Sequence, residues 1–348
     1  MPLTIPSTGM PRVILGLMTF GPDEGAGARI TDAATYGRVL DVFQKERGYS
    51  EVDTARVYVN GAQEAFTRDA GWKDRGLMLA TKVMYPAEDG AHQGPKVLES
   101  VETSLKELGT DCVDILYVHA ADRSTPFAET FAALDKLHKA GKFVRLGVSN
   151  YTAFELAEVV MLCKANGWVR PTIYQGIPSC SPACRRYGLD VVVYNPIAGG
   201  LFSGKIKSKD MVPTEGRFSD THGTGRNYRG RYFKDSTFEA LRVVEEAVAK
   251  HEKDGLTMIE TALRWVRHHS ALKLGESGSD SGDGIIIGIS SLEQLGNNLD
   301  NLEKGPLPDD VVAALDKAWR IAKPDAPVYW HKDLVYTYDT KEALFGKK

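Results

Sequence analysis

The stretch Leu77-Met-Leu-Ala-Thr-Lys82 is a short apolar run that ends on a charged residue. An amphipathic segment follows at Pro95–Leu108, and a second apolar run, Val113-Asp-Ile-Leu-Tyr-Val-His119, ends on a titratable residue. A strand, a helix and a second strand in this order predict parallel pairing with a right-handed crossover. The polar residue that ends each run then falls at the C-terminal edge of the sheet, where parallel barrels place their catalytic groups.

The same alternation extends over the whole chain. The predicted strands are Val13–Met18, Ser50–Ala55, Leu77–Val83, Val113–His119, Val144–Ser149, Pro171–Gly176, Asp190–Pro196 and Gly284–Ser290. The predicted helices are Ala33–Arg47, Gly61–Trp72, Pro95–Leu108, Pro126–Ala140, Ala153–Asn166, Thr237–Glu252, Met258–His269 and Asp309–Ile321. Eight such units predict an α/β fold, the (β/α)8 TIM barrel. An open doubly wound sheet is the alternative, but no Gly-x-Gly-x-x-Gly follows an early strand.

Composition fits one soluble barrel domain. The chain has 348 residues, which we interpret as a single domain over 1–348 with a C-terminal extension at 323–348. The net charge of −3 without a basic block argues against a nucleic-acid partner. The N-terminus does not read as a signal peptide, and no run approaches the roughly 18 apolar residues of a membrane helix. Four cysteines favour a reducing, cytoplasmic location. We interpret Cys180 and Cys184 as ordinary loop residues, and we expect no metal site.

Three segments depart from the regular alternation. Ile197–Ser236 is a long connection, which in a compact domain is usually functional or disordered. Residues 275–284 are rich in Gly, Ser and acidic residues, which is typical of a flexible surface insertion. Ile177–Leu189 is too short for a full-length barrel helix, and a missing helix would expose the barrel core.

Four polar residues at or just after strand ends suit one kind of chemistry. Tyrosine is a weak acid with an ordinary pKa of about 10, which a nearby ammonium lowers. Lys82 can supply that ammonium, and Asp53 can hold it by a charge-assisted hydrogen bond. Tyr58 would then protonate a carbonyl oxygen that His119 orients, while a nicotinamide supplies the hydride.

Each residue alone also has a plainer interpretation. Asp53 could cap the following turn, Tyr58 could lie at the edge of the core, and Lys82 could be solvated. His119 could be a partly buried histidine whose hydrogen bonds are satisfied. Because three of the four lie on consecutive strand ends, we favour the joint, functional interpretation.

These residues lie in motifs that resemble a known family. Asp53-Thr-Ala-Arg-Val-Tyr58-Val-Asn-Gly61-Ala-Gln-Glu64, Ala80-Thr-Lys82, Val118-His119 and Gly147-Val-Ser149-Asn150 resemble the aldo-keto reductase superfamily. Further segments resemble its aflatoxin-aldehyde reductase branch: Asn166–Gly176, Asn195–Lys205, Gly216–Phe218, Tyr228–Phe233 and Ser290–Asn298. The resemblance covers residues 12 to 320. It implies NADPH-dependent reduction of aldehydes and some ketones, with Tyr58 as the proton donor, Lys82 and Asp53 as its support and His119 as the substrate-orienting residue.

The resemblance also implies where NADPH/NADP+ and the substrate bind. The implied cofactor residues are Asp53, Ser149, Asn150, Gln175, Asn195, Pro196, Ile197, Ala198, Gly199, Gly200, Leu201, Gly204, Lys205, Arg217, Ser290, Ser291, Gln294 and Asn298. Ser291 with Gln294 has capping-box spacing, and a helix N-terminus suits the 2′-phosphate. His119, Tyr228 and Arg231 are the implied contacts of a small-molecule carbonyl substrate, and an Arg there would suit a carboxylate-bearing aldehyde. Relatives are often dimers, so a homodimer is the expected assembly.

The sequence departs from the family at two places, because it lacks a C-terminal Arg that some relatives place near the substrate and because it differs around Pro178. The family follows its Tyr-Gln-Gly-x motif with a Tyr that stacks on the nicotinamide, and this chain has Pro178 there. An absent stacking residue would weaken cofactor binding. The alternative function is therefore a catalytically impaired NADP(H)-binding barrel that acts as a sensor or accessory subunit.

Overall fold

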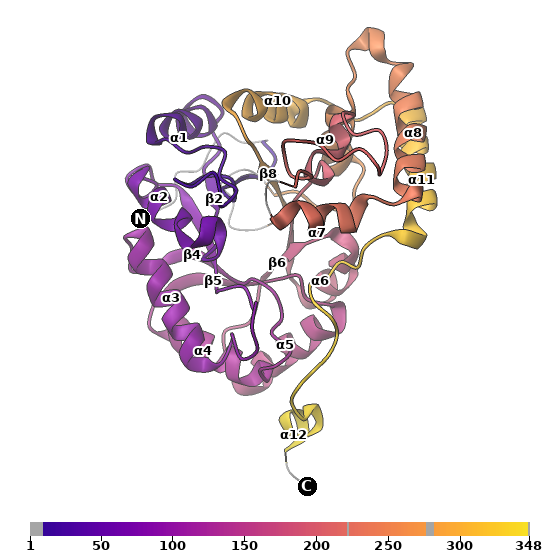
Figure 1. Ribbon diagram of the computed structural model, residues 1–348. Helices are drawn as coiled ribbons and strands as arrows, with labels where there is room; N and C mark the ends of the chain where they lie inside the picture. The colour runs from indigo at the N-terminus through magenta and orange to yellow at the C-terminus, as the bar shows by residue number, and fades with distance from the viewer. Residues whose placement is uncertain (1–9, 221–222, 276–281, 347–348) are drawn as a thin grey trace. The chain divides into compact units, whose positions relative to one another are not determined.

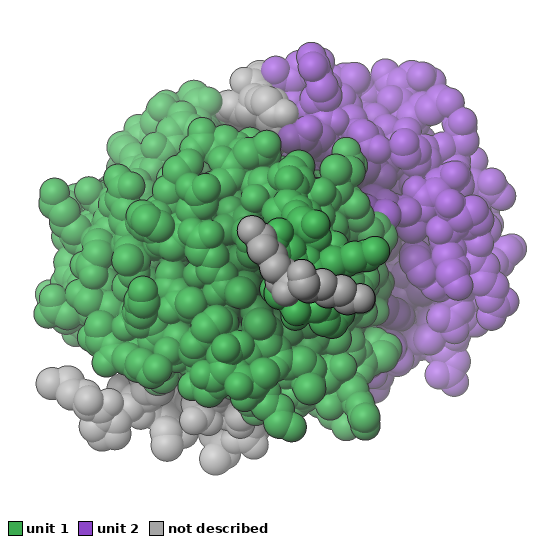
Figure 2. Space-filling view, turned by 90° about the horizontal axis from the view of Figure 1, so that it is seen from below, with its two compact units in different colours: residues 1–194, 273–290, 329–348 green, residues 195–272, 291–328 purple. Residues whose placement is uncertain are grey.

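The computed structural model describes residues 10–220, 223–275 and 282–346. The chain divides into two compact units, coloured separately in Figure 2. Unit 1 comprises residues 1–194, 273–290 and 329–348, and unit 2 comprises residues 195–272 and 291–328. The single-domain interpretation stays a prediction. The N-terminal start and most of the Gly- and Ser-rich stretch at 275–284 lie outside the described residues.

Unit 1 contains a closed barrel of eight parallel strands in chain order. The strands are β1 Val13–Gly16, β2 Glu51–Asp53, β3 Met78–Lys82, β4 Val113–Val118, β5 Phe143–Ser149, β6 Ile173–Gly176, β7 Asp190–Val193 and β8 Gly284–Gly288. Each overlaps its predicted range, so the predicted (β/α)8 barrel is confirmed. The register pairs Gly16 with Asp53, Lys82 with Tyr117, and Ser149 with Gln175.

The helices of unit 1 lie between successive strands, except α12 near the C-terminus, and can be followed along Figure 1. They are α1 Ala33–Leu40, the π-helical η1 Asp41–Glu46, η2 Tyr58–Gly61, α2 Gln63–Asp69, α3 Gly94–Leu108, α4 Phe127–Lys139, α5 Ala153–Asn166, η3 Pro178–Cys180, α6 Ser181–Tyr187 and α12 Thr340–Phe345. Helix α5 has its predicted bounds, and Thr152 and Glu155 form a complete capping box at its start. Gly167 ends it in a left-handed conformation, which glycine adopts without steric cost.

Unit 2 is built from helices and the long connection after β7. Its helices are η4 Ala198–Ser203, α7 Gly223–Tyr232, α8 Asp235–Ala249, η5 Glu252–Asp254, α9 Met258–His268, α10 Leu292–Glu303, α11 Asp309–Ala322 and η6 Lys323–Asp325. The long connection therefore contains two helices, η4 and α7, that the sequence did not predict. Helices α8 and α11 share one apolar core that includes Val244 and Val311.

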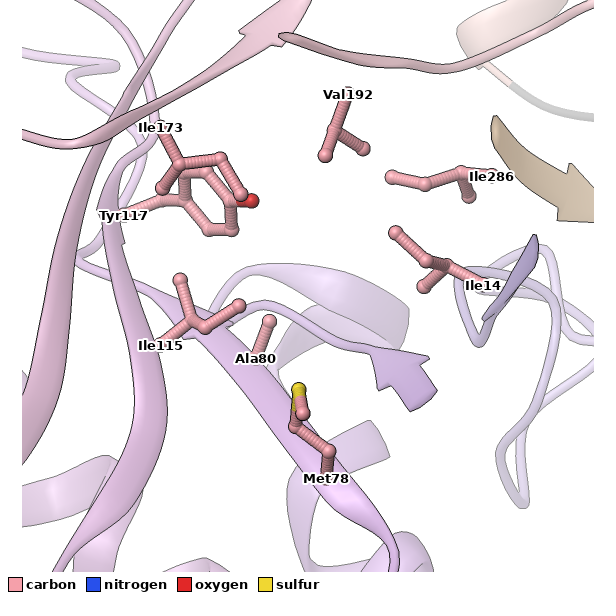
Figure 3. Close-up of a cluster of buried hydrophobic side chains, with 8 residues drawn as sticks. All are labelled: Ile14, Met78, Ala80, Ile115, Tyr117, Ile173, Val192 and Ile286. Carbon is pink, nitrogen blue, oxygen red and sulfur yellow. The ribbon is translucent and has the colours of Figure 1, made fainter. Parts of the chain in front are cut away.

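Large side chains fill the interior of the barrel. Figure 3 shows the cluster, which consists of Ile14, Met78, Ala80, Ile115, Tyr117, Ile173, Val192 and Ile286. Gly147 makes room for the largest of them, because a Cβ at this position would lie 2.3 Å from the ring of Tyr117. Near the first residues of the strands, the buried Arg12 donates to both carboxylate oxygens of Glu51 at 2.8 and 2.7 Å. The barrel is a packed core, and its C-terminal rim is the part left for chemistry.

The short link between β6 and β7 forms the 3-10 turn η3 and about two turns of helix, α6. Helix α6 has seven residues, so the predicted lack of a full-length helix is confirmed. Arg185 on this helix donates to Asp283 just before β8, with 2.8 Å between Nη1 and Oδ1. The expected exposure of the barrel core is wrong, because Ile173 and Tyr174 are both fully buried. The link is short but seals this side of the barrel.

Candidate active site

The four predicted catalytic residues come together at the C-terminal rim of unit 1. Asp53 is the last residue of β2 and Lys82 is the last residue of β3. His119 directly follows β4, and Tyr58 begins η2 after a short loop. Parallel strands send their C-terminal ends to one rim, so residues far apart in sequence converge there.

Lys82 is the centre of this group. Its Nζ lies 2.6 Å from Oδ2 of Asp53 and donates to the carbonyl oxygen of Thr54 at 2.7 Å. The same Nζ lies 3.4 Å from the phenol oxygen of Tyr58. It also lies 5.1 Å from the centre of the Tyr58 ring. A single ammonium therefore joins the carboxylate to the proposed acid.

Burial and charge pairing have opposite effects on the pKa values of Asp53 and Lys82. Both side chains are almost wholly inaccessible. Loss of water raises the pKa of Asp53 and lowers the pKa of Lys82, and the attraction between the two charges opposes both shifts. Gln175 adds a further donor to the carboxylate, with 2.8 Å between Nε2 and Oδ1 of Asp53. Hydrogen bonds from two donors favour the charged form of the carboxyl group.

His119 is held as a neutral imidazole. Burial lowers its pKa well below the ordinary value, and the positive charge of Lys82 adds to that effect. Within the described residues, its buried Nδ1 has no hydrogen-bonding partner. The ring packs edge-on against Tyr58 and Tyr85, with centroids 5.9 and 5.3 Å away. A neutral ring can direct a hydrogen bond to a substrate oxygen without adding a charge.

A strained turn directs Tyr58 into the site. The two residues after it, Val59 and Asn60, have φ of 48° and 52°, a region that a β-branched residue rarely adopts. Arg56 holds the turn by donating to the carbonyl oxygen of Gly61 at 2.6 Å and by pairing with Glu64. Such backbone strain persists where the surroundings enforce it, which is typical of functional sites.

Three predicted cofactor residues lie on the same rim. Ser149 ends β5, Asn150 follows it with φ of 60°, and Gln175 lies in β6 opposite Ser149. The amide of Asn150 donates to Ser149 Oγ and to the carbonyl oxygen of His119, both at 2.9 Å. All three are buried and present amide or hydroxyl groups, which match the hydrogen-bonding groups of a carboxamide. These residues therefore fit a nicotinamide.

Tyr194 is an aromatic residue at this rim that the sequence analysis did not single out. It follows β7, is half-buried, and donates to Asn150 Oδ1 at 2.7 Å. Tyr194 directly follows β7, but the strand predicted from the sequence extends to Pro196 and therefore contains it. The hydrogen bond to Asn150 places Tyr194 beside one of the predicted cofactor residues, where an aromatic face suits a flat heterocycle.

Other predicted cofactor residues belong to unit 2. In η4, Gly199 and Gly200 have φ of 70° and 98°. A Cβ on Gly199 would lie 2.6 Å from the Tyr228 ring, so only glycine fits there. The guanidinium of Arg217 lies 5.4 Å from the centre of the same ring. Asn195 accepts a hydrogen bond from the Gly199 amide. Small residues and a cation thus gather around Tyr228.

The remaining predicted cofactor residues are spread over both units. Ser291 caps α10 by accepting from the Gln294 amide at 3.2 Å, and Asn298 is buried on the same helix. Ser290 belongs to unit 1 and is exposed. The side chain of Leu201 is 2% exposed and belongs to the core of unit 2, so only its backbone could serve a ligand. Pro196, Ile197, Ala198, Gly204 and Lys205 occupy the same Gly-rich segment, and Tyr228 and Arg231 lie half-buried on α7.

Membrane-spanning helices and metal-ligand clusters are both absent from the described residues. No helix in the described ranges is both long and apolar enough to cross a membrane. Among the same residues, no group of three or more His, Cys, Asp or Glu side chains is arranged to hold a metal ion. Cys180 and Cys184 are buried free thiols that lie in η3 and α6, so their interpretation as loop residues is wrong.

Comparisons with known proteins agree with this geometry. The sequence model of the aldo/keto reductase family matches residues 12–320. An aldo-keto reductase of Pseudocercospora fijiensis is 38% identical over 304 residues, which is 84% of this chain and all of that protein. Human aflatoxin B1 aldehyde reductase member 4 is 39% identical over 340 residues, covering 93% and 98% of the two chains. Mouse aflatoxin B1 aldehyde reductase member 2 is 39% identical over 336 residues, covering 92% and 88%.

Proposed function

Because the chain belongs to the aldo/keto reductase family, we propose that it reduces aldehydes and some ketones to alcohols with NADPH. The observation that carries the proposal is the position of Lys82, whose Nζ contacts both Asp53 and Tyr58. A barrel that only bound a nucleotide would have no need for a buried ammonium beside a phenol. Burying a charge is costly unless it is paired, as it is here.

The proton-transfer part of the reaction follows from this chain's own residues. Bound nicotinamide supplies the hydride. Tyr58 gives its phenolic proton to the carbonyl oxygen of the substrate, and the Lys82 ammonium stabilises the phenolate that remains. Asp53 keeps Lys82 in place from a distance of 2.6 Å. His119, held neutral by burial, donates a hydrogen bond that fixes the direction of the carbonyl group.

The cofactor residues divide according to the part of NADPH that each would hold. Ser149, Asn150 and Gln175 would bind the carboxamide, and Tyr194 would offer its ring to the nicotinamide. The Gly-rich segment at 195–205 would bind the pyrophosphate through its backbone. Arg217 and the N-terminus of α10, with the residues already named there, would bind the 2′-phosphate.

Two residues of α7 support a narrower proposal about the substrate. Tyr228 and Arg231 are half-buried, and we assign them to substrate binding together with His119. An arginine suits an aldehyde that carries a carboxylate, such as succinic semialdehyde, because its guanidinium pairs with two carboxylate oxygens. The cytoplasmic location and the homodimer also stay predictions.

The alternative function rests on the shortened link at Ile177–Leu189. A barrel with a damaged cofactor wall could bind NADP(H) without turning over a substrate. Two observations favour the catalytic proposal instead. Helix α6 closes the link over a buried core, and Tyr194 offers an aromatic ring beside Asn150. Tyr194 can therefore supply the aromatic ring that the sequence lacks at Pro178.

Purified protein supplied with NADPH and a panel of carbonyl compounds separates the two functions. The panel includes 4-nitrobenzaldehyde and succinic semialdehyde, and the loss of NADPH absorbance is followed over time. We expect consumption that depends on the carbonyl compound. Tight NADPH binding without turnover of any panel member would favour the sensor or accessory subunit.

A further inference from the structure

The C-terminal segment of residues 329–338 returns to unit 1 and binds near the start of α5. Figure 1 shows this segment in yellow beside α5 and α6. Tyr329 Oη accepts a hydrogen bond from the amide of Ala153 at 3.0 Å, and the amide of Thr337 donates to the carbonyl oxygen of Arg123 at 3.1 Å. The segment is thus attached at both of its ends.

A buried ion pair holds the middle of the segment. Arg123 and Glu155 are 5% and 0% exposed, and they form two hydrogen bonds of 2.7 and 3.0 Å. Nη1 of Arg123 points away from Glu155 and donates to the carbonyl oxygen of His331 at 2.7 Å. It also lies 3.3 and 3.5 Å from the next carbonyl oxygens, those of Asp333 and Lys332. On the other side, Glu155 accepts from Tyr336 Oη at 2.6 Å. The pair therefore contacts the segment through both of its members.

This anchoring places His331 at the catalytic rim. Its amide donates to the carbonyl oxygen of Asn150 at 3.3 Å. One ring nitrogen lies 3.3 Å from Tyr85 Oη, and the other lies 3.5 Å from Tyr194 Oη. Tyr85 in turn packs edge-on against His119 at 5.3 Å. The ring of His331 thus stands between the two tyrosines that flank the residues proposed to hold the substrate and the nicotinamide.

We propose that Arg123 and Glu155 are positioning residues, which hold residues 331–333 so that His331 forms a wall of the substrate site. The wall made by Tyr85 and His331, whose ring centroids lie 6.0 Å apart, would favour flat aromatic carbonyl compounds over small aliphatic ones, because aromatic rings attract one another when they pack together. This inference rests on the proposed function for its substrate, while the anchoring itself does not depend on turnover.

A purely structural role for the ion pair is the competing explanation. Glu155 also caps α5 by accepting from the Thr152 amide at 2.8 Å, so its loss would weaken that helix in either case. The two explanations differ at Arg123. If the pair acts through the segment, removing Arg123 and removing His331 must have the same, non-additive effect on substrate selection. A structural role predicts no such coupling.

The test compares His331→Ala, Arg123→Met and the double variant in the full-length protein. KM and kcat are measured with 4-nitrobenzaldehyde and with propanal. We expect each single variant to raise the KM for 4-nitrobenzaldehyde by up to about tenfold, the order expected for losing one aromatic contact, while kcat and the propanal values stay near wild type. The double variant should match either single variant. Arg264→Met removes a comparable arginine from its pair with Glu260 in unit 2 and should leave both KM values unchanged.

Hydrogen exchange of residues 329–338 provides a second measurement that does not depend on catalytic turnover. Arg123→Met should accelerate exchange there, and His331→Ala should not. If Arg123→Met does not fold, Arg123→Lys, which keeps the charge but not the fork of donors, is measured in its place. Unchanged exchange in the arginine variant would overturn the anchoring, and an unchanged KM in His331→Ala would overturn the wall.

If the proposed function is wrong, the wild-type protein consumes no NADPH with any carbonyl compound. Quenching of tryptophan fluorescence by 4-nitrobenzaldehyde then measures binding in place of KM. Binding that weakens by up to about tenfold in both single variants would still support the positioning role, since it reports the same lost contact. Equal binding by all variants would overturn it.

Discussion

The side-chain amide of Gln175 donates a 2.8 Å hydrogen bond to the carboxylate of Asp53. Gln175 belongs to the group proposed to hold the nicotinamide carboxamide, and Asp53 pairs with Lys82, which we propose supports the proton donor. The bond crosses the barrel interior from β6 to β2, which are not neighbours in the sheet. Hydrogen bonds therefore connect the proposed carboxamide site to the proposed proton donor through Asp53 and Lys82.

Gln175→Leu tests this connection. The variant leaves Oδ1 of the buried Asp53 without this donor, and an unsatisfied buried group costs about 1–3 kcal/mol. We expect a lower melting temperature and weaker NADPH binding, measured by thermal unfolding and by fluorescence titration. Gln93→Leu alters an exposed glutamine and serves as the control. Equal NADPH affinity in wild type and Gln175→Leu would contradict the assignment.

The ion pair of Lys82 and Asp53 is expected to serve activity more than stability. Lys82→Met leaves a buried carboxylate without its cation, and breaking such a pair costs about 3–5 kcal/mol in unfolding free energy. The double variant Asp53→Leu, Lys82→Met replaces both charges with apolar groups and should recover most of that loss. Urea unfolding checks the stability of each variant. Recovered stability with recovered turnover would contradict the role of Lys82 in catalysis.

The buried histidines predict how stability varies with pH. Burial lowers the pKa of both His119 and His92, so in mild acid the unfolded chain binds more protons than the folded one. The unfolding free energy should therefore rise with pH up to the ordinary histidine value of about 6.5 and then level off. Below that value each histidine changes the unfolding free energy by about 1.4 kcal/mol per pH unit. Urea unfolding at pH 5.5 and 7.5 should show a smaller difference for His119→Gln than for wild type. An equal difference would mean that His119 does not titrate in this way.

Asp283 is expected to be essential for closing the short link after β6. It is fully buried, pairs with Arg185 on α6, and accepts the Val191 amide at 2.7 Å. Asp283→Ala should lower the unfolding free energy by about 3–5 kcal/mol, since it leaves a cation and backbone donors without their acceptor. Glu46→Gln breaks the exposed pair with Arg38 and should cost less than about 1 kcal/mol. Similar urea midpoints for the two variants would show that the pair does not stabilise the link.

Strong local signals made most of the barrel predictable. Ala153–Asn166 was predicted with its final bounds because Thr152, Glu155 and Gly167 mark both ends of the helix. The group of four proposed catalytic residues, Asp53, Tyr58, Lys82 and His119, was predictable because each lies at or just after the end of a buried strand. Helix α6 was not predicted, because a seven-residue helix with prolines near its start has no clear amphipathic period. Helix α7 consists mainly of Gly, Arg and Tyr, and shows no apolar stripe.

Local sequence patterns did not predict contacts between residues that are far apart in the chain. Tyr194 was assigned to the body of the predicted strand Asp190–Pro196, so its place at the rim was not recognised. The contact between Arg123 and His331 joins residues 208 positions apart, and neither residue lies in a motif. Only the folded chain brings such groups together, because no local preference encodes their pairing.

The variant Tyr58→Phe tests whether Tyr58 protonates the substrate. The variant removes only the phenolic oxygen that lies 3.4 Å from Lys82 Nζ. Single-turnover NADPH oxidation is measured with 4-nitrobenzaldehyde, alongside NADPH binding by fluorescence. We predict that oxidation slows at least about 100-fold while NADPH affinity is unchanged, because general acid catalysis contributes about 100- to 10,000-fold. Oxidation at the wild-type rate in Tyr58→Phe would contradict the account.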